Sequence, residues 1–283
     1  GSISLEGARV ISQLAYDAEQ FVLRLAAPRC AARAAPGSFV HLTCDESIPM
    51  RRPLSIMRAD AKAGWIEILY KVVGAGLHAL AAKQAGDTVS VLGPIGRPFI
   101  VHPERPRTLL LGGGVGIPPM VFLAERLKGN AHFRPLVLMG SEVPFPFRAR
   151  PSATLLSGMP AGSIACMPLL EEWGVPSRLA SRAEFPGCFP GFVTELAAEW
   201  LASLDEAQLA QVEIFSCGPT AMLRASAELA RRFRLPCQVS LEEFMACGVG
   251  GCAGCTVEVR TAAGPAMKRV CVDGPVFDAY SVF

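Results

Sequence analysis

The sequence has no long apolar run that could continue as a single helix. Two long uncharged stretches occur at 108–124 and 151–170, but the first contains Gly112-Gly113-Gly114 and Pro118-Pro119, and the second contains three prolines. These residues exclude an uninterrupted membrane-spanning helix. The N-terminus also lacks the basic segment and apolar core of a secretory signal, so we expect a cytoplasmic protein without a membrane partner.

Neither sign of charge dominates the chain, and lysines and arginines form no long run. The 283 residues include 27 Lys and Arg against 25 Asp and Glu. A nucleic acid or an anionic membrane surface would require a strong positive field, so neither is expected as a partner. The balance favours small molecules and other proteins. The length suffices for two or three compact domains, each with its own core.

A disulfide framework is also missing, although the chain has ten cysteines. Six of them show no framework spacing, which favours buried, reduced side chains that act as small hydrophobes. These six are Cys30, Cys44, Cys166, Cys188, Cys217 and Cys237. The other four lie near the C-terminus, where their spacing indicates a specific chemistry.

The clustered cysteines Cys247, Cys252, Cys255 and Cys271 are spaced C-x4-C-x2-C-x15-C. Plant-type ferredoxins share the short gaps of this spacing, and their four thiolates hold a 2Fe-2S cluster. Four glycines within the first nine residues suit a loop that curls tightly around sulfur, because glycine supplies the positive φ angles that such a loop needs. Cys271 follows a strand-like segment and a Gly/Pro turn, so a hairpin could return it to the other thiols. The sequence therefore predicts a centre that moves single electrons.

A four-cysteine zinc site is the alternative interpretation. Structural zinc sites usually pair their thiols as two short Cys-x2-Cys units. This chain has one such unit, one four-residue gap and one distant partner, so we favour an iron-sulfur cluster. The histidines are scattered without ligand spacing, and none is predicted to bind metal. They are His41, His78, His102 and His132.

The first hundred residues consist of short apolar segments separated by turns. Apolar residues alternate or run together in four segments, and pairs such as Pro36-Gly37 and Ala63-Gly64 separate them. This pattern predicts a small antiparallel β-barrel over residues 1–102. The four predicted strands are 21–25, 38–42, 65–73 and 88–92.

Strands and helices alternate after the polar linker 103–107. This is the β-α-β rhythm of a doubly wound nucleotide-binding domain, which we place at 103–236, with a small cluster domain at 237–283. The predicted fold class is thus α+β multidomain. Segment 141–189 is rich in proline and alanine and has little periodicity, so it resists interpretation. The expected strands are 108–111, 135–139 and 213–216, and the expected helices are 118–128 and 219–233.

Two junctions in the α/β domain indicate a nucleotide site. A glycine loop, 112–116, joins a predicted strand to a predicted helix, where bare backbone can approach a pyrophosphate and helix-end amides can bind it. Cys217-Gly218-Pro219 occupies the equivalent position after a later strand. Both turns are expected at the carboxyl end of one sheet, where open α/β sheets bind ligands. The glycine loop departs from strict G-x-G-x-x-G spacing, and a tight turn without a ligand is the alternative.

In the barrel, the informative segment is Arg51-Arg52-Pro53-Leu54-Ser55-Ile56. An arginine, a proline-fixed bend and a hydroxyl within four residues suit a diphosphate and the edge of a flavin, because guanidinium is a bidentate phosphate partner. By itself such a segment is more often a solvated turn. The order of motifs along the chain favours a role in flavin binding, because this segment is followed by Val73-Gly74-Ala75-Gly76-Leu77, then by the two junctions and then by the cysteine cluster.

That series resembles the ferredoxin-NADP reductase superfamily, and within it the electron-transfer subunits of the NAD-dependent, class 1B dihydroorotate dehydrogenases. The resemblance covers nearly the whole chain and is strongest at 235–248 and 269–277, including the Cys-x-Asp-Gly-Pro-Val-Phe tail. It weakens over 141–189. Leu77 stands where the family usually has a threonine, which removes one hydroxyl from the expected flavin site.

The resemblance implies a route for electrons. NADH would give a hydride to FAD, and the flavin would pass electrons singly to a 2Fe-2S cluster and on to a partner. In the resembled enzymes the partner is an FMN-containing dihydroorotate dehydrogenase catalytic subunit, which interconverts dihydroorotate and orotate in pyrimidine biosynthesis. No acid-base pair is required, so no catalytic residue is expected.

Motif by motif, the resemblance also implies binding residues. The metal ligands would be the four clustered cysteines. The nicotinamide nucleotide would meet Gly113, Gly114, Gly116 and Cys217. FAD would be lined by Arg52, Pro53, Leu54, Ser55, Leu69, Tyr70, Lys71, Gly76 and Leu77.

Two other readings stay open. One is the small subunit of a ferredoxin:NADP transhydrogenase or sulfide dehydrogenase, which shares the same motifs. The other is a non-catalytic iron-sulfur sensor or a zinc-stapled adaptor that retains the reductase fold.

Glu142, after the second strand of the α/β domain, favours NADH because a carboxylate would repel a 2′-phosphate. The exposed side of the cysteine loop, Gly248 to Gly254, which includes Val249, is the expected docking face.

Overall fold

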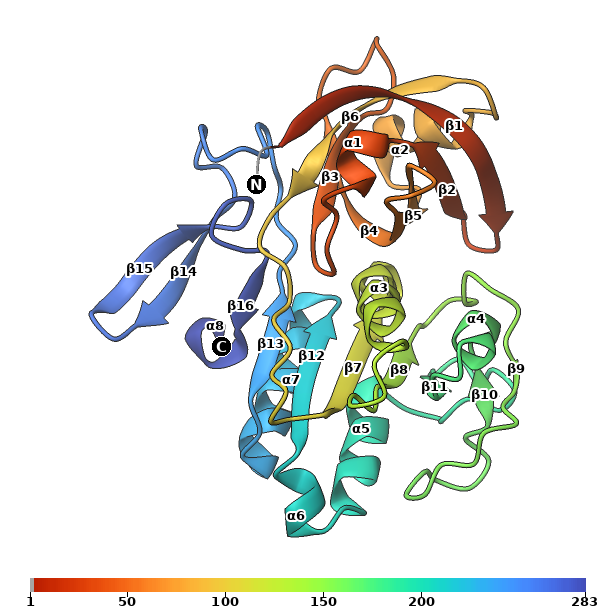
Figure 1. Ribbon diagram of the computed structural model, residues 1–283, viewed down its shortest axis with the longest axis vertical. Helices are drawn as coiled ribbons and strands as arrows, with labels where there is room; N and C mark the ends of the chain where they lie inside the picture. The colour runs from red at the N-terminus through yellow and green to blue at the C-terminus, as the bar shows by residue number, and fades with distance from the viewer. Residues whose placement is uncertain (1–2) are drawn as a thin grey trace. The chain divides into compact units, whose positions relative to one another are not determined.

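The computed structural model of the protein describes residues 3–283, which fall into two compact units. The first combines the described residues up to Pro98 with Leu241–Val276, and the second combines Phe99–Ser240 with Phe277–Phe283. The barrel and the cysteine loop therefore belong to one unit, and the strand-helix alternation belongs to the other (Figure 1).

A closed six-stranded barrel with the strand order β1-β2-β5-β4-β3-β6 occupies the first unit (Figure 1). Every neighbouring pair is antiparallel. Leu23, Leu25 and Ile68 are fully buried and help to fill its core. The strands are β1 (Ser4–Tyr16), β2 (Gln20–Ala26), β3 (Phe39–Thr43), β4 (Arg52–Asp60), β5 (Trp65–Lys71) and β6 (Thr88–Ile95), and the helices are α1 (Pro28–Ala31) and α2 (Gly74–Ala81).

The four predicted barrel strands correspond to β2, β3, β5 and β6, whereas β1 and β4 were not predicted. The expected bend at Pro53 is wrong, because Pro53 lies within β4, opposite His41 of β3. Proline lacks an N–H, so it fits a strand only where the ladder requires no donor from it. The flavin motif is therefore displayed on a barrel strand and not on a turn.

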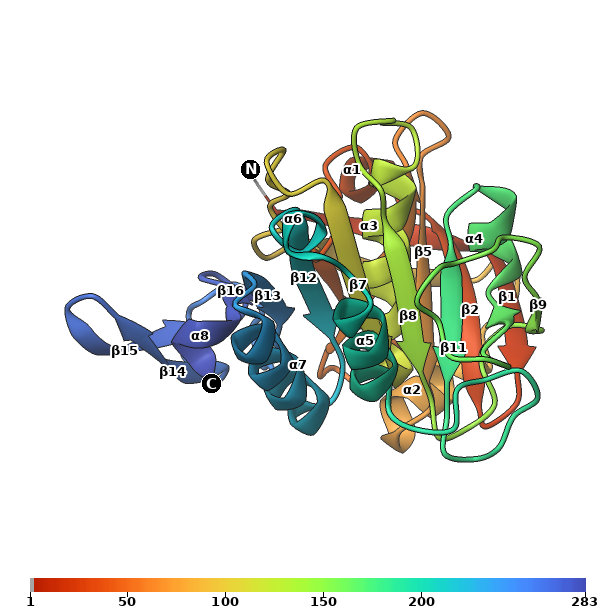
Figure 2. The same ribbon diagram turned by 90° about the horizontal axis from the view of Figure 1, so that it is seen from below.

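The cysteine segment is joined to the barrel by hydrogen bonds. The Arg97 N–H, just after β6, donates to the Gly274 carbonyl at 2.6 Å, and the Arg97 side chain donates to the Val272 carbonyl at 3.2 Å. The two ends of the segment are joined to each other, because the Leu241 N–H donates to the Pro275 carbonyl at 2.9 Å. Between these points, β14 (Thr256–Thr261) and β15 (Gly264–Arg269) form the predicted antiparallel hairpin, labelled in Figure 2. The hairpin returns the chain toward the first three cysteines.

The second unit is built on a six-stranded sheet in the order β11-β8-β7-β12-β13-β16. Neighbours from β11 to β13 are parallel, as the β-α-β rhythm predicts. Helix α3 covers one face of this sheet, and α5 and α7 cover the other (Figure 2). The main elements are β7 (Arg107–Gly113), the short 3-10 turn η1 (Gly114–Gly116), α3 (Ile117–Leu127), β8 (Leu136–Gly140), α5 (Val193–Ala202), α6 (Glu206–Leu209), β12 (Val212–Cys217), α7 (Thr220–Phe233), β13 (Cys237–Ser240), β16 (Val276–Asp278) and α8 (Ala279–Val282).

The segment that resisted sequence interpretation contains short elements held by side-chain hydrogen bonds. Glu171 accepts hydrogen bonds from the Ala153 N–H at 2.7 Å and from the Ser152 hydroxyl at 3.0 Å. Burial by itself raises the pKa of Glu171, but these bonds and one from Thr154 outweigh it and lower the pKa. The elements are β9 (Arg150–Pro151), β10 (Ala165–Cys166), α4 (Pro168–Glu172) and β11 (Ser177–Ala180).

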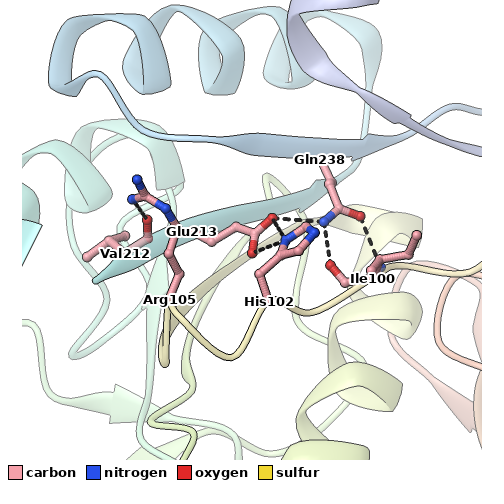
Figure 3. Close-up of polar contacts among 6 residues, drawn as sticks. All are labelled: Ile100, His102, Arg105, Val212, Glu213 and Gln238. Carbon is pink, nitrogen blue, oxygen red and sulfur yellow. Dashed lines mark hydrogen bonds and ion pairs between the residues drawn. The ribbon is translucent and has the colours of Figure 1, made fainter. Parts of the chain in front are cut away.

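The linker that precedes β7 is fixed to the sheet through a buried carboxylate (Figure 3). Glu213 of β12 is 1% exposed, and both of its oxygens lie 3.0 Å from His102 Nδ1. Gln238 donates to Glu213 at 2.9 Å and also bonds both backbone groups of Ile100. A buried charge requires such partners, so these contacts fix the path of the linker over β12 and β13.

Among residues 3–283, no helix combines the length and apolarity needed to cross a membrane.

Candidate functional site

The four clustered cysteines come together as two pairs. The Cys255 and Cys271 Sγ atoms lie 3.4 Å apart, and the Val270 N–H donates to the Cys255 carbonyl beside them. In the other pair, the Cys252 N–H donates to Cys247 Sγ at 3.4 Å. The hairpin thus brings Cys271 back to Cys255, which is the arrangement that the sequence predicted.

Backbone amides surround the exposed pair and favour negative charge on sulfur. The Val249 N–H points at Cys247 Sγ from 3.5 Å, and the Gly254 N–H points at Cys252 Sγ from 3.4 Å. The amides of Val249 and Cys252 lower the pKa of Cys247 to about 6. Burial and the neighbouring Cys255 raise the pKa of Cys271, so a thiolate there needs a cation beside it.

Glycines allow the loop to take this shape. Gly248 and Gly250 have φ angles of +68° and +85°, in the left-handed region. A Cβ added at Gly250 would lie 2.5 Å from Val272 Cγ2. The Arg269 guanidinium donates to the Gly250 carbonyl at 2.8 Å and so holds the loop against the end of the hairpin. The predicted need for positive φ angles is confirmed.

The paired thiols fit a two-iron centre better than a single ion. A mononuclear zinc site would gather its ligands around one point, about 2.3 Å from each sulfur. Two pairs of thiols match a 2Fe-2S cluster, in which four thiolates are divided between two irons.

The flavin motif on β4 lies beside the N-terminus of α2, in the same unit as the cysteines. A Cβ added at Gly76, in the first turn of α2, would lie 3.0 Å from Arg52 Nε and 3.1 Å from Arg52 Cζ. The guanidinium therefore packs on the glycine backbone, next to the amides of a helix start. A cation and the positive end of a helix dipole in contact form an anion-binding arrangement, as a diphosphate requires.

Side chains inside the barrel hold α2 in place. Gln13 Nε2 donates to the carbonyls of Leu80, Ala81 and Lys83 at the end of that helix, at 2.9–3.1 Å. Gln13 Oε1 accepts a 2.8 Å hydrogen bond from the Tyr70 hydroxyl. Burial raises the pKa of Tyr70, so its hydroxyl stays protonated and able to donate.

The other residues predicted to line FAD differ in exposure. Tyr70 is 1% exposed and stacks on Phe21, so its ring belongs to the barrel core. Leu69 and Leu77 are also buried. The remaining predicted residues are partly exposed: Pro53, Leu54 and Ser55 on β4, and Lys71 at the end of β5.

Arg51 differs from its neighbour in the motif. Its guanidinium donates to the His41 carbonyl at 3.0 Å and to the Ser90 hydroxyl at 3.0 Å. It thus connects β3 and β6 inside the barrel wall. His41 itself is fully buried, and burial together with Arg51 lowers its pKa. The position of His41 between Val40 and Leu42 in a predicted strand is the sequence signal for this burial.

The two junctions of the nucleotide-binding sheet meet as predicted. Gly112 of β7 is paired with Cys217 of β12, so both strands end at the same edge. A Cβ on Gly116 would overlap the backbone of Cys217, and one on Gly113 would overlap the Met222 sulfur. Gly114, at φ +53°, has open space around it. The open space at Gly114 leaves room for a pyrophosphate near the start of α3.

Glu142, the residue expected to favour NADH, lies beyond β8 and is half-exposed. Its carboxylate forms an ion pair with Arg182, with 3.3 Å between Glu142 Oε2 and Arg182 Nε. A neighbouring arginine partly offsets the repulsion that a free carboxylate would exert on a 2′-phosphate, which weakens the electrostatic argument for NADH.

Two family models match the chain. The oxidoreductase FAD-binding domain matches residues 7–99, and the iron-sulfur cluster binding domain of dihydroorotate dehydrogenase B matches residues 242–283. The protein is thus an oxidoreductase component with a flavin-binding barrel and a C-terminal cluster-binding segment.

Relatives with curated names extend the similarity over the whole length. The electron transfer subunit of dihydroorotate dehydrogenase B (NAD(+)) from Geobacillus thermodenitrificans (strain NG80-2) is 34% identical over 285 residues, covering 99% of each chain. The subunit of that name from Shouchella clausii (strain KSM-K16) is 33% identical, covering 86% of this chain and 84% of its own.

Solved structures agree with the fold. A chain from an NADH-dependent reduced ferredoxin-NADP oxidoreductase superposes with a TM-score of 0.77 at 25% identity, covering 100% of this chain and 91% of its own. Phthalate dioxygenase reductase, at 15% identity and a TM-score of 0.58, covers 94% and 77% and shares the fold. The motifs, the paired thiols and the full-length similarity together show that this chain belongs to the family of electron transfer subunits of dihydroorotate dehydrogenase B.

Proposed function

We propose that this chain carries electrons from NADH to an FMN-containing dihydroorotate dehydrogenase catalytic subunit in the cytoplasm, through FAD and a 2Fe-2S cluster. The observation that carries the proposal is the presence of two thiol pairs and a flavin-type anion site in one compact unit. When bound, FAD accepts two electrons as a hydride, whereas the cluster accepts electrons singly, so together they convert a pair donor into a one-electron supply.

The protein's own residues bind and align the groups. Arg52 and the first amides of α2 would hold the FAD diphosphate, and Pro53, Leu54 and Ser55 would present the β4 backbone and hydroxyl to the flavin. Tyr70 acts indirectly, because its hydroxyl holds Gln13 and Gln13 holds α2. Leu69, Lys71, Gly76 and Leu77 complete the lining predicted from the family.

The edge of the α/β sheet would hold the nicotinamide nucleotide. Gly114 has open space around it, whereas Gly113 and Gly116 pack tightly against Met222 and the backbone of Cys217, which bring the end of β12 to the start of α3. Hydride transfer between two cofactors requires alignment and exclusion of water more than a protein acid or base. The ion pair with Arg182 weakens the repulsion that Glu142 would exert on a 2′-phosphate. Steady-state rates with NADH and NADPH therefore test the preference for NADH.

The cysteine loop would dock the partner subunit. Phe244 is 94% exposed and Val249 is 48% exposed, on either side of Cys247. Exposed apolar side chains beside a redox centre suit a protein interface that excludes water. Cys252 is also exposed, which places one ligand of the expected cluster at this surface.

The direct test is an anaerobic assay with purified components. NADH is added to this chain with and without an FMN-containing dihydroorotate dehydrogenase subunit, and conversion of orotate to dihydroorotate is measured. Orotate reduction that needs both chains supports the proposal. Rapid bleaching of flavin and cluster bands without orotate reduction in the mixture would show the redox chemistry to be right and the partner wrong.

A second candidate is the small subunit of a ferredoxin:NADP transhydrogenase or sulfide dehydrogenase. It is favoured by the likeness to a chain of the NADH-dependent reduced ferredoxin-NADP oxidoreductase, which extends over 100% of this protein. A partner of the glutamate synthase small-subunit type would distinguish it. The zinc-adaptor alternative predicts a colourless protein with one zinc, which metal analysis detects. An iron-sulfur sensor would have coloured bands that NADH does not bleach.

A further inference from the structure

His41 connects the flavin-bearing barrel to the cysteine loop. It lies in β3 opposite Pro53, in the middle of the flavin motif. Its ring packs on the other side against Gly248, because a Cβ added at that glycine would lie 2.7 Å from His41 Nδ1 and 3.3 Å from Cγ. Gly248 directly follows Cys247. One side chain therefore touches the turn that carries a cluster ligand while its own strand supports the flavin motif.

The surroundings of the ring do not explain why a histidine is present. His41 is 0% exposed, and neither ring nitrogen makes a hydrogen bond of good geometry. The backbone of Met245 and Cys247 nevertheless lies close enough to polarise the ring. A buried polar group with incomplete hydrogen bonding destabilises a fold, and a phenyl ring would fill similar space without that cost. The barrel therefore gains no hydrogen bond from the ring nitrogens, and one of them lies against Gly248 of the cysteine loop.

We propose that His41 is a positioning residue for the iron-sulfur centre: its ring packs on Gly248 and so fixes the Cys247–Gly248 turn against the barrel, and its ring nitrogens set the polarity beside Cys247. Polar groups next to cluster sulfurs change the reduction potential, and groups that orient a ligand influence a metal nearly as much as the ligand itself. The inference rests on the iron-sulfur centre of the proposed function.

The first experiment compares His41→Phe with the wild-type protein. Iron, sulfide and FAD contents are measured first, followed by the electron paramagnetic resonance spectrum of the reduced cluster and its reduction potential. We expect normal contents, altered g-values and a lower potential, because a dipole that favours the extra electron is lost. A tenfold change in the one-electron equilibrium corresponds to 59 mV, and we expect a shift of about that size. His41→Asn, which restores a polar donor near the position of Nδ1, should recover most of it.

A second experiment tests the contact with Gly248 and does not depend on the stability of His41→Phe. Gly248→Ala should disturb the cluster spectrum, both because its Cβ meets the ring and because alanine is strained at φ +68°. Gly251→Ala in the same loop is the matched control, because a Cβ there meets nothing within 4 Å.

The outcomes separate this inference from the proposed function. A wild-type protein without iron and sulfide would overturn the iron-sulfur centre itself. A normal iron content with the same potential and g-values in His41→Phe would overturn only the role of His41. If His41→Phe fails to fold, a cluster spectrum and potential in Gly248→Ala that match those of Gly251→Ala overturn it instead.

Discussion

The contact between the two nucleotide-binding junctions predicts a large effect for Gly116→Ala. The new Cβ would overlap the carbonyl carbon and oxygen of Cys217 and the amide nitrogen of Gly218. All three are backbone atoms of a strand end that is paired with β7, so no side-chain rotation can relieve the overlap. The strand end and the glycine turn must move apart, and the edge that would receive the pyrophosphate changes shape.

The expected magnitude follows from the cost of overpacking. Inserting a methyl group into a well-packed core destabilises by about 1–3 kcal/mol, and contact with backbone on both sides places this case near about 3 kcal/mol. For a domain of 150–250 residues, that lowers the melting temperature by roughly 6–12 °C. Gly113→Ala should cost less, because its Cβ meets the flexible Met222 side chain, and Met222→Ala should relieve it.

The assay is thermal unfolding followed by circular dichroism, together with calorimetric titration of NAD(+) into the folded protein. Gly129→Ala is the control, because that glycine lies just beyond α3 and a Cβ there has open space. We expect Gly116→Ala to melt earlier and to bind the nucleotide at least about tenfold more weakly, which is about 1.4 kcal/mol. If Gly116→Ala and Gly129→Ala behave alike in both measurements, the two junctions do not meet as described.

Three further predictions concern the flavin site, the docking face and the loop region. Arg52→Ala should weaken FAD binding by roughly 10- to 150-fold, the loss of one charge-assisted hydrogen bond of about 1.5–3 kcal/mol; full FAD retention after dilution, equal to that of the exposed control Arg9→Ala, would place the diphosphate elsewhere. Val249→Glu should slow electron transfer to the partner while flavin reduction by NADH stays normal, and Met267→Glu on the hairpin should change neither rate; a parallel fall of both rates in Val249→Glu would indicate damage to the loop. Because hydrogen bonds lower the pKa of Glu171, its carboxylate stabilises the fold above the ordinary glutamate pKa of about 4.3, and this stability is lost as pH falls through the folded-state value. Urea unfolding should therefore show Glu171→Gln to be less stable than the wild type at pH 7, with the difference shrinking toward pH 3, and a difference independent of pH would exclude this origin.

Elements with strong local signals were predictable from the sequence. The strands β7 and β12 are short apolar runs that end in glycine-containing turns, and α3 opens with two prolines, so both the elements and their common edge could be inferred. The cysteine spacing predicted the loop because positive φ angles at Gly248 and Gly250 follow from the need to point amides at sulfur. Such features depend on a few adjacent residues.

Features that depend on distant contacts were not predictable. β4 looked like a turn because Pro53 and two arginines dominate its start, yet pairing with β3 and β5 makes it a strand. The segment around α4 has little periodicity because Glu171 organises it through hydrogen bonds and not through an apolar face. The contact of His41 with Gly248 joins residues more than two hundred positions apart. No local pattern records that pairing.

The central claim is that this chain supplies electrons to a dihydroorotate dehydrogenase catalytic subunit. It is tested most directly by isolating the chain from its native cells under anaerobic conditions and identifying by mass spectrometry the protein that copurifies with it. We predict an FMN-binding dihydroorotate dehydrogenase subunit, which would make orotate the terminal acceptor and pyrimidine biosynthesis the pathway. Recovery of a glutamate-synthase-like flavoprotein in its place would contradict the claim and assign the chain to transhydrogenation or sulfur metabolism.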